Sequence, residues 1–275
     1  MAATGHNVEL RGGRVHYRAW SRGAGPLLLL VHGFRGHSHW WDWIAPAFAA
    51  DYDVVALDLS GMGDSDWRRE YEPDTFALDI LGLIEHLQAG PAIVVGHSFG
   101  GGSLLRACAL DAREAPERHI GHAIVVDSWI RLAGHPMPAE RGRVGAGGPY
   151  ADFETARRRF RLSPLQIVAD PAMLDYLARC SLRETPEGWR WKFDPSLPMP
   201  ESRDSRDTLG RVQVPVDIVY GESSSIVNQE LAAACVAALP RGRGPVVVPG
   251  AHHMMFDRPL AFIATLRSLL ADARG

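Results

Sequence analysis

The sequence has few cysteines and little net charge. Its three cysteines, Cys108, Cys180 and Cys235, lie far apart and include no Cys-x-x-Cys pair. This excludes a disulfide scaffold and a thiolate zinc site, and it favours a reducing, cytoplasmic compartment. The formal net charge is only −3, whereas a general nucleic-acid binder carries a basic excess. We therefore expect no nucleic-acid partner.

Long apolar runs and cofactor motifs are also missing. The longest apolar run, residues 27–31, is far too short to span a bilayer, so we expect no membrane partner. Histidines and carboxylates do not recur at metal-ligand spacing. The glycines at 100–102 follow a serine and have no phosphate-binding lysine, so they form neither a dinucleotide nor a P-loop motif. We predict no cofactor and no metal, and the oligomeric state is left open.

Short apolar runs alternate with longer helical patterns along the 275 residues. Residues 14–20 alternate as a half-exposed strand does. Buried strands are predicted at 27–31, 54–57, 93–95, 123–126, 216–220 and 246–248. Helices are predicted near 39–49, 75–88, 99–113, 227–239 and 258–273. The alternation predicts an α/β fold with a mostly parallel sheet, helices on both faces, and ligands bound beyond the carboxyl ends of the strands.

One stretch, residues 129–208, breaks this alternation and contains no predicted buried strand. Helical segments near 153–162 and 171–181 are followed by an aromatic cluster around Trp189 and Trp191. We predict a cap inserted into a core domain formed by residues 1–128 and 209–275. From 130 to 192 there are eleven Arg or Lys against seven Asp or Glu. This excess hints at an anionic substrate, although surface arginine is the simpler explanation.

The most informative motif is Gly96-His97-Ser98-Phe99-Gly100, which follows a buried run and precedes a helical pattern. A Gly-x-Ser-x-Gly sequence in this context is typical of a nucleophile elbow, a strained turn from strand to helix that exposes the serine. Side chains at the flanking glycines would collide with the neighbouring strand and helix. The alternative is a glycine-rich turn with an ordinary surface serine.

The chain resembles the serine-nucleophile branch of the α/β-hydrolase superfamily over nearly its whole length. The matching segments occur in the expected order, at His32-Gly33-Phe34, 58–65, 96–100 and Pro249-Gly250-Ala251-His252-His253. The resemblance implies a mostly parallel eight-stranded sheet with a helical cap inserted after the sixth strand.

A serine nucleophile needs a base, and the base needs a third group to orient it. The resemblance favours His252 as the base, because the family typically has a proline seven residues later and Pro259 stands there. Counting from Pro249-Gly250 favours His253 instead.

The acid is where the chain departs from the commonest family pattern, because the expected position holds Ser224. A known variation moves the acid to the end of the sixth strand, where this chain has Asp127. The order Ser98, Asp127, His252 then keeps nucleophile, acid and base in sequence. Glu222 is the rival acid, and a plain strand-end cap is the other interpretation of Asp127.

Two backbone N–H groups are predicted to form an oxyanion hole, those of Phe34 and Phe99. An unusually aromatic segment follows the oxyanion loop, which predicts an apolar or aromatic substrate pocket. The residues assigned to that pocket are Trp40, Trp41, Trp129 and Met254.

These residues predict a serine hydrolase that cleaves a carboxylic ester, thioester or lactone of a small-molecule substrate through an acyl-enzyme on Ser98. Two alternatives stay open. One is a cofactor-free dioxygenase or carbon–carbon bond hydrolase of the same fold that uses the His–Asp pair. The other is a ligand-binding relative without activity, which only the Ser224 departure supports.

Overall fold

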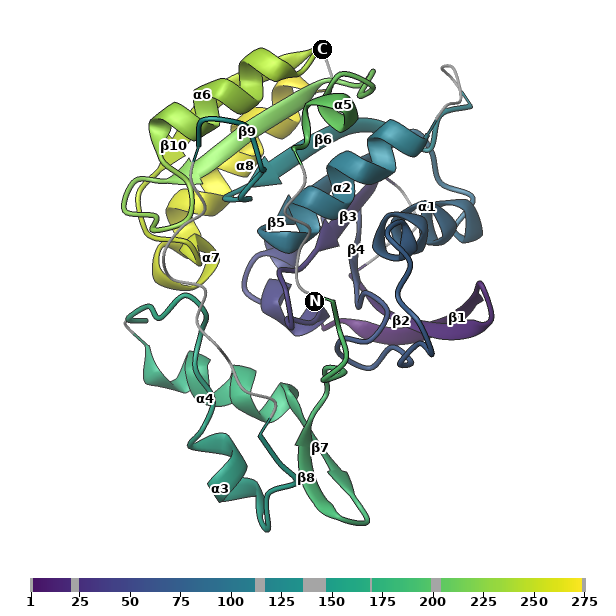
Figure 1. Cartoon of the computed structure of the whole chain (residues 1–275), viewed down its shortest axis with the longest axis vertical. Coiled ribbons are helices and arrows are strands. Elements are labelled where there is room, and N and C mark those ends of the chain that lie inside the picture. The colour runs from purple at the N-terminus through teal and green to yellow at the C-terminus, as the bar shows by residue number, and fades with distance from the viewer. Residues whose placement is uncertain are drawn as a thin grey trace.

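A computed structural model describes residues 2–20, 25–111, 117–135, 147–168, 170–198 and 204–273. Eight strands form one sheet in the order β1-β2-β4-β3-β5-β6-β9-β10 (Figure 1). The first two ladders, β1–β2 and β2–β4, are antiparallel and the other five are parallel. The strands are β1 Thr4–Leu10, β2 Gly13–Trp20, β3 Leu27–Val31, β4 Asp53–Leu57, β5 Ala92–His97, β6 Ile120–Val126, β9 Val216–Gly221 and β10 Gly242–Val248. The α/β fold with a mostly parallel eight-stranded sheet is confirmed.

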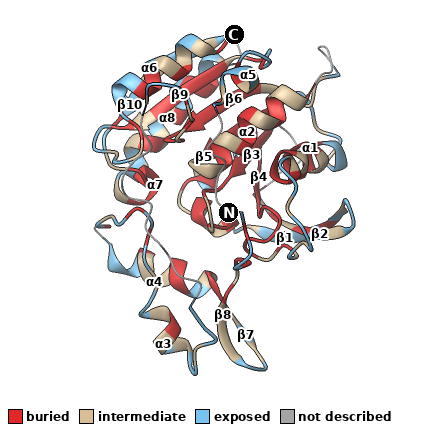
Figure 2. Cartoon of the chain, viewed as in Figure 1, coloured by how far each residue is buried: buried red, intermediate tan, exposed pale blue. Residues whose placement is uncertain are grey.

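The central strands are buried on both faces because successive residues enter two different cores. In β3, Leu27 and Leu29 pack into one apolar cluster and Leu28 and Leu30 into the other. Figure 2 shows the resulting band of buried residues through the middle of the sheet. Strands covered on both sides become continuous apolar runs in the sequence, which is why these runs predicted the sheet.

Helices cover both faces of the sheet. Residues of α1 Thr75–His86, α2 Phe99–Leu110 and α6 Gln229–Ala238 belong to the first cluster, and residues of α8 Pro259–Asp272 belong to the second. The shorter helices are α3 Phe153–Arg157, α4 Pro171–Cys180, α5 Arg206–Leu209 and α7 Met254–Asp257. Among the helices described, none combines the length and the apolarity needed to cross a membrane.

Two parts of the sequence prediction need correction. The helix predicted near 39–49 is two short 3₁₀ turns, η1 Ser38–Trp41 and η2 Ala45–Ala47, with Pro46 within the second. Strand β1 was not recognised, because six of its seven residues are at least partly exposed. Residues 112–113 of the helix predicted at 99–113, and residues 136–146, 169 and 199–203 of the predicted cap, lie outside the described part.

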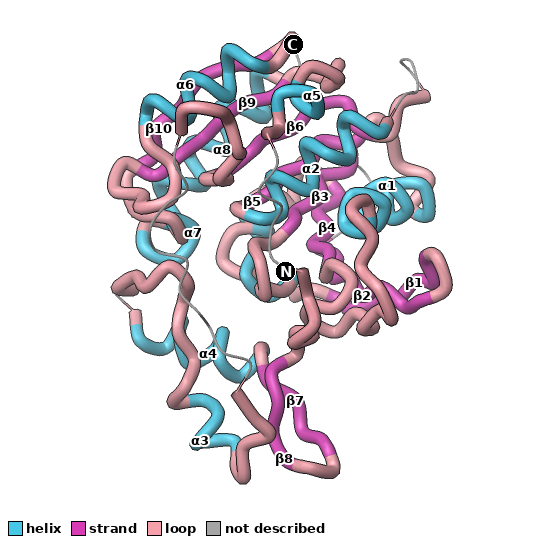
Figure 3. The backbone as a smooth tube through the Cα atoms, viewed as in Figure 1, coloured by secondary structure: helices cyan, strands magenta, loops and turns pink. Residues whose placement is uncertain are grey.

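The described residues of 129–208 contain α3, α4, α5 and a separate two-stranded hairpin, β7 Leu182–Thr185 and β8 Gly188–Trp191. Figures 1 and 3 show α3, α4 and this hairpin together, apart from the main sheet. The half-exposed hairpin was not predicted, since its residues do not form an apolar run.

Side chains tie this segment to the core at several points. The Tyr176 hydroxyl on α4 donates to Asp42 beside η1, and Gln166 bonds both backbone groups of His253, at 2.8 and 3.2 Å. The inserted residues are therefore held against the loop that carries the late histidines.

Candidate active site

Ser98 occupies a strained backbone position between β5 and α2. Its φ is 53° and its ψ is −118°, a combination that non-glycine residues rarely adopt. The N–H of Ser98 donates to the carbonyl of Val126 at 2.8 Å, which holds the turn against β6. Strain of this kind persists only where the surroundings enforce it, and it is concentrated at functional sites.

The glycines around Ser98 allow strand and helix to approach closely. A Cβ at Gly96 would lie 2.6 Å from the carbonyl oxygen of Gly100, and one at Gly100 would lie 2.5 Å from that of His32. Both distances are shorter than real Cβ contacts. A larger residue at either position would push α2 away from the sheet and lower the serine out of its raised position.

Asp127 and His252 meet although 125 residues separate them in the chain. Asp127 lies directly after β6, and its Oδ1 is 2.9 Å from Nδ1 of His252. The carboxylate also accepts from the N–H of Gly221 at 2.6 Å and from the hydroxyl of Ser224 at 2.6 Å. Asp127 is fully buried and has a positive φ of 45°. A buried carboxylate with three donors is held in place and fixes the imidazole that it contacts.

Neither rival residue is hydrogen-bonded to Asp127 among the described contacts. Glu222 is exposed, while its backbone N–H pairs with Val248. His253 is buried beside His252, with ring centroids 4.6 Å apart, and its ring contacts the backbone of Ser163 but has no side-chain partner among the described residues. The side chain at the commonest acid position, Ser224, instead donates to Asp127.

The two predicted oxyanion residues lie next to each other. Phe34 follows β3 and Phe99 is the first residue of α2, and their rings meet edge to face with centroids 5.4 Å apart. The first N–H groups of a helix have no partner within it, so that of Phe99 is available for a ligand. The neighbouring His32 bridges the N–H of Leu59 and the carbonyl of Gly33, as expected of a structural residue.

A cavity of about 870 Å³ lies between the core and the inserted residues. Ser98, His252, Phe34 and Phe99 line it, together with side chains of both segments. Its apolar and aromatic lining includes Trp40, Phe76, Trp129, Phe160, Trp191 and Phe193.

Two of the four residues assigned to the pocket are not among those lining the cavity. Trp40 and Trp129 line it. Trp41 is buried in the second core instead, where its ring stacks on Phe262 of α8. Met254 is also fully buried in that core. The expectation is corrected for Trp41 and Met254, because neighbouring residues in a tight turn project in different directions.

Three buried imidazoles line the cavity close to one another. One nitrogen each of His97, His252 and His253 lies within 4.8 Å of the others, a cluster that could hold a metal ion. Burial, followed by the nearby His252, lowers the pKa of both His97 and His253 well below the ordinary value, so both are neutral near pH 7. Sequence spacing could not show this cluster, because His97 is far from the other two in the chain.

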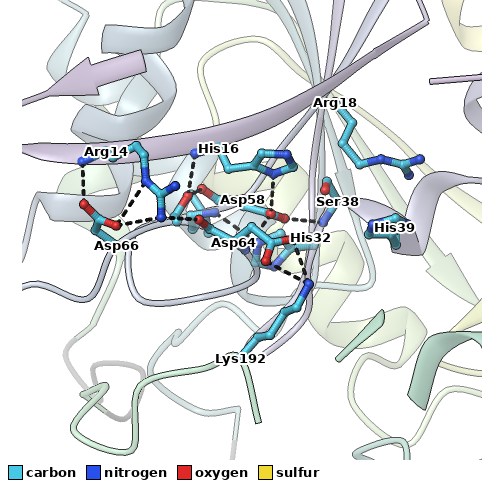
Figure 4. A network of polar contacts seen from close by, with 12 residues as sticks. Arg14, His16, Arg18, His32, Ser38, His39, Asp58, Asp64, Asp66 and Lys192 are labelled. Atoms are coloured by element: carbon cyan, nitrogen blue, oxygen red, sulfur yellow. Dashed lines mark hydrogen bonds and ion pairs between the residues drawn. The ribbon is translucent and has the colours of Figure 1, made fainter. Parts of the chain in front are cut away.

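A second polar cluster, around Asp58, supports the loop after Phe34, where the N–H of Ser38 donates to Asp58 (Figure 4). Buried Asp58 accepts from His16 at 2.8 Å and from the N–H of Asp64 at 2.9 Å. Burial alone would raise the pKa of Asp58, but the bond and charge of His16 outweigh it and lower the pKa. Lys192, the only lysine of the chain, pairs with Asp64 at 2.8 Å. His16, Asp58 and Asp64 could also hold a metal ion, but these contacts already occupy them.

Comparisons with known proteins identify the family of the chain. Residues 28–265 match the model described as the alpha/beta hydrolase family. The class of protein that the fold and this match define is a hydrolase enzyme. The chain belongs to the alpha/beta hydrolase family.

Two relatives match over most of both chains. The chain is 29% identical over 260 residues to 2-(acetamidomethylene)succinate hydrolase of Mesorhizobium japonicum, covering 88% of this chain and 86% of that protein. It is 28% identical over 255 residues to pimeloyl-[acyl-carrier protein] methyl ester esterase of Neisseria meningitidis, covering 88% and 91%. A crystal structure of E-2-(acetamidomethylene)succinate hydrolase matches with a TM-score of 0.79 at 23% identity, covering 98% and 100%, which shows the shared fold.

Proposed function

We propose that this hydrolase is a serine esterase that cleaves a carboxylic ester, thioester or lactone through an acyl-enzyme on Ser98. The observation that carries the proposal is the 2.9 Å contact between His252 Nδ1 and Asp127 Oδ1, beside a cavity that Ser98 lines. Residues 129–208 are proposed to act as a cap over this cavity. One relative's name, a methyl ester esterase, supports the ester bond as the target.

In this mechanism His252 removes the proton of Ser98 as the hydroxyl attacks the substrate carbonyl. Asp127 holds Nδ1 of His252 protonated, so that Nε2 is the atom that accepts the proton, and it stabilises the imidazolium that forms. The N–H groups of Phe34 and Phe99 donate to the oxygen of the tetrahedral intermediate. His252 then returns the proton to the leaving group, and water resolves the acyl-enzyme by the same steps.

Labelling of the nucleophile tests the covalent step. A fluorophosphonate should add one adduct to the wild-type protein, measured by intact mass, and none to Ser98→Ala. Hydrolysis of aryl esters of graded acyl length should be lost together with the label. Active protein that remains unlabelled at Ser98 would reject the acyl-enzyme.

The contact between Ser224 and Asp127 counts against the inactive relative. The chain lacks a carboxylate at position 224, but Asp127 supplies one at the end of the adjacent strand, and Ser224 donates to it.

An oxygen electrode separates the esterase from the dioxygenase alternative. Oxygen uptake with hydroxyquinolone-type substrates that survives in Ser98→Ala would favour proton abstraction by His252 over acyl transfer.

A further inference from the structure

The base of the proposed mechanism, His252, lies on a loop. This loop connects β10 to α7 and contains Gly250 at a positive φ of 120°. A loop residue has no ladder of backbone hydrogen bonds, so its position depends on the other groups that its backbone contacts. Nε2 of His252 must come within hydrogen-bond reach of the Ser98 hydroxyl to take its proton. The side chains that hold this loop therefore determine whether the base can act.

Two side chains outside the inserted residues hold His252 itself. Nε2 of His97, at the end of β5, donates to the backbone carbonyl of His252 at 2.9 Å. Asp127, directly after β6, contacts the ring of His252 at Nδ1. Both contacts end at His252 and leave the backbone of the next residue, His253, to be fixed by other groups.

Gln166 holds the backbone of His253 through both ends of its side-chain amide. Its Oε1 accepts from the N–H of His253 at 2.8 Å, and its Nε2 donates to the carbonyl at 3.2 Å. The carbonyl also accepts from the N–H of Phe256 at 2.9 Å. For the N–H of His253, Gln166 is the only acceptor among the described residues. His253 is 1% exposed, so water cannot easily replace this bond.

The burial pattern around Gln166 explains why its side chain faces the loop. Pro164 and Val168 are buried, whereas the residues on either side of Gln166 are 77% and 92% exposed. Such alternation is typical of an extended chain, in which successive side chains point to opposite faces. Gln166 therefore shares a face with the buried residues. A polar side chain on that face needs hydrogen-bond partners, and the backbone of His253 supplies them.

Gln166 belongs to the inserted residues 129–208, so its bonds join this segment to the loop of the base. Its near neighbours Leu162, Ser163 and Pro164 line the cavity. One short stretch of chain thus forms part of the cavity wall and also holds the His252 loop. The placement of the base therefore depends on the placement of the inserted segment.

We propose that Gln166 is a positioning residue for the reaction, because it fixes the His253 backbone and thereby places Nε2 of His252 for proton transfer from Ser98. This inference rests on the proposed esterase function and adds a residue of the inserted segment to it. Consecutive Cα atoms are about 3.8 Å apart, so a shift of the His253 backbone also moves His252. A misplacement of about 1 Å can cost about 100-fold in rate.

The test is Gln166→Met, which keeps the length of the side chain and removes both hydrogen bonds. With a short-chain p-nitrophenyl ester, kcat should fall about 10- to 100-fold while KM stays close to the wild-type value. Proton transfer is impaired in this variant, whereas the walls that bind the ester are retained. A variant that changes only KM or only the thermal stability would show a structural role and would overturn the inference.

The matched control is Tyr176→Phe. Tyr176 also joins the inserted residues to the core, through its hydroxyl and Asp42, but its described contacts include neither of the late histidines. Its variant should keep the wild-type kcat. Circular dichroism checks that both variants are folded. An equal loss of kcat in both would show that any contact of the inserted segment matters, and would overturn the specific role of Gln166.

A proton resonance tests the inference without turnover. The hydrogen on Nδ1 of His252 lies between that nitrogen and Asp127 in a buried position. It should give a low-field NMR signal, assigned by its absence in His252→Gln. This signal should shift or broaden in Gln166→Met and stay unchanged in Tyr176→Phe.

The two measurements separate this inference from the proposed function. An unchanged signal and an unchanged kcat in Gln166→Met would overturn the positioning role alone. A wild type that hydrolyses no aryl ester and takes no fluorophosphonate label would reject the esterase. The response of the His252 signal to Gln166→Met would still decide whether Gln166 positions His252.

Discussion

Replacing Asp127 by Asn changes one atom of the proposed acid and leaves its shape unchanged. Oδ2 of Asp127 accepts from the backbone N–H of Gly221, and Oδ1 faces the hydroxyl of Ser224 and Nδ1 of His252. The Gly221 donor cannot reorient, so the amide oxygen of Asn should take the Oδ2 position. The NH₂ group then faces His252.

An NH₂ group facing Nδ1 forces that nitrogen to act as an acceptor. The proton moves to Nε2, which can then no longer take the proton of Ser98, and the carboxylate charge that stabilises the imidazolium is lost. From these two effects we expect kcat/KM to fall about 10³- to 10⁴-fold, which corresponds to about 4 to 5.5 kcal/mol of transition-state stabilisation. The hydroxyl of Ser224 already accepts from the N–H groups of Ile226 and Val227, so its bond to residue 127 should be lost and the variant should be less stable.

The assay is hydrolysis of a short-chain p-nitrophenyl ester by Asp127→Asn, with Glu222→Gln as the matched control. Glu222 is an exposed carboxylate two residues before Ser224. Its variant should keep the wild-type rate. Circular dichroism and thermal unfolding check that Asp127→Asn is folded. A folded Asp127→Asn that retains more than a tenth of the activity, or a large loss in Glu222→Gln, would refute the assignment of the acid.

Three further predictions follow from other contacts. Ser224→Ala removes the hydroxyl that donates to Asp127 and accepts from two backbone N–H groups. Urea unfolding should therefore show a free energy of unfolding about 1 to 3 kcal/mol lower, and kcat/KM should fall. Unchanged stability and rate would contradict a supporting role of Ser224. His253→Phe replaces a buried imidazole that contacts the backbone of Ser163 but has no side-chain partner among the described residues. Differential scanning calorimetry should therefore show a Tm about 2 to 4 °C higher for each kcal/mol gained. A lower Tm would show that the contact with Ser163 stabilises the fold. His39 bonds Asp42 beside Tyr176 of α4; burial lowers its pKa, but the hydrogen bonds to Asp42 and Cys180 outweigh burial and raise the pKa to about 9. Because the pKa of His39 is higher in the folded state, the stabilisation by protonated His39 is fully present below about pH 6.5 and is lost as pH rises towards about 9. The free energy of unfolding of His39→Gln should therefore decline less over that interval than that of the wild type. An equal decline in both proteins would disprove the contribution of His39.

The sheet could be predicted from sequence because burial on both faces produces continuous apolar runs, as in β3 and β5. Elements with one exposed face leave a weaker signal. Strand β1 and the β7–β8 hairpin were missed for that reason. The aromatic segment after Phe34 was predicted as a helix, but it forms two 3₁₀ turns, the second of which contains Pro46.

The position of Ser98 could be predicted from sequence because the short motif around it determines the geometry of the turn. The glycines around Ser98 are required by contacts within a few residues and by the adjacent strand. Lining of a cavity depends on side-chain direction, which sequence patterns do not give, so Trp40 and Trp41 could not be told apart. The cluster of His97 with the two late histidines joins distant segments and could be seen only in three dimensions.

The geometry of two neighbouring strands explains how a serine can stand at the commonest acid position. Strands β6 and β9 are parallel, with Val126 paired to Val219, and the N–H of Asp127 donates to the carbonyl of Val219 at 2.8 Å. The residues after both strands therefore emerge at the same edge of the sheet, within reach of His252. A carboxylate from either strand can orient the same imidazole, so the choice of strand is not fixed by the fold. In the proposed site the acid is Asp127, directly after β6, so the side chain after β9 need not be a carboxylate, and Ser224 there donates to Asp127.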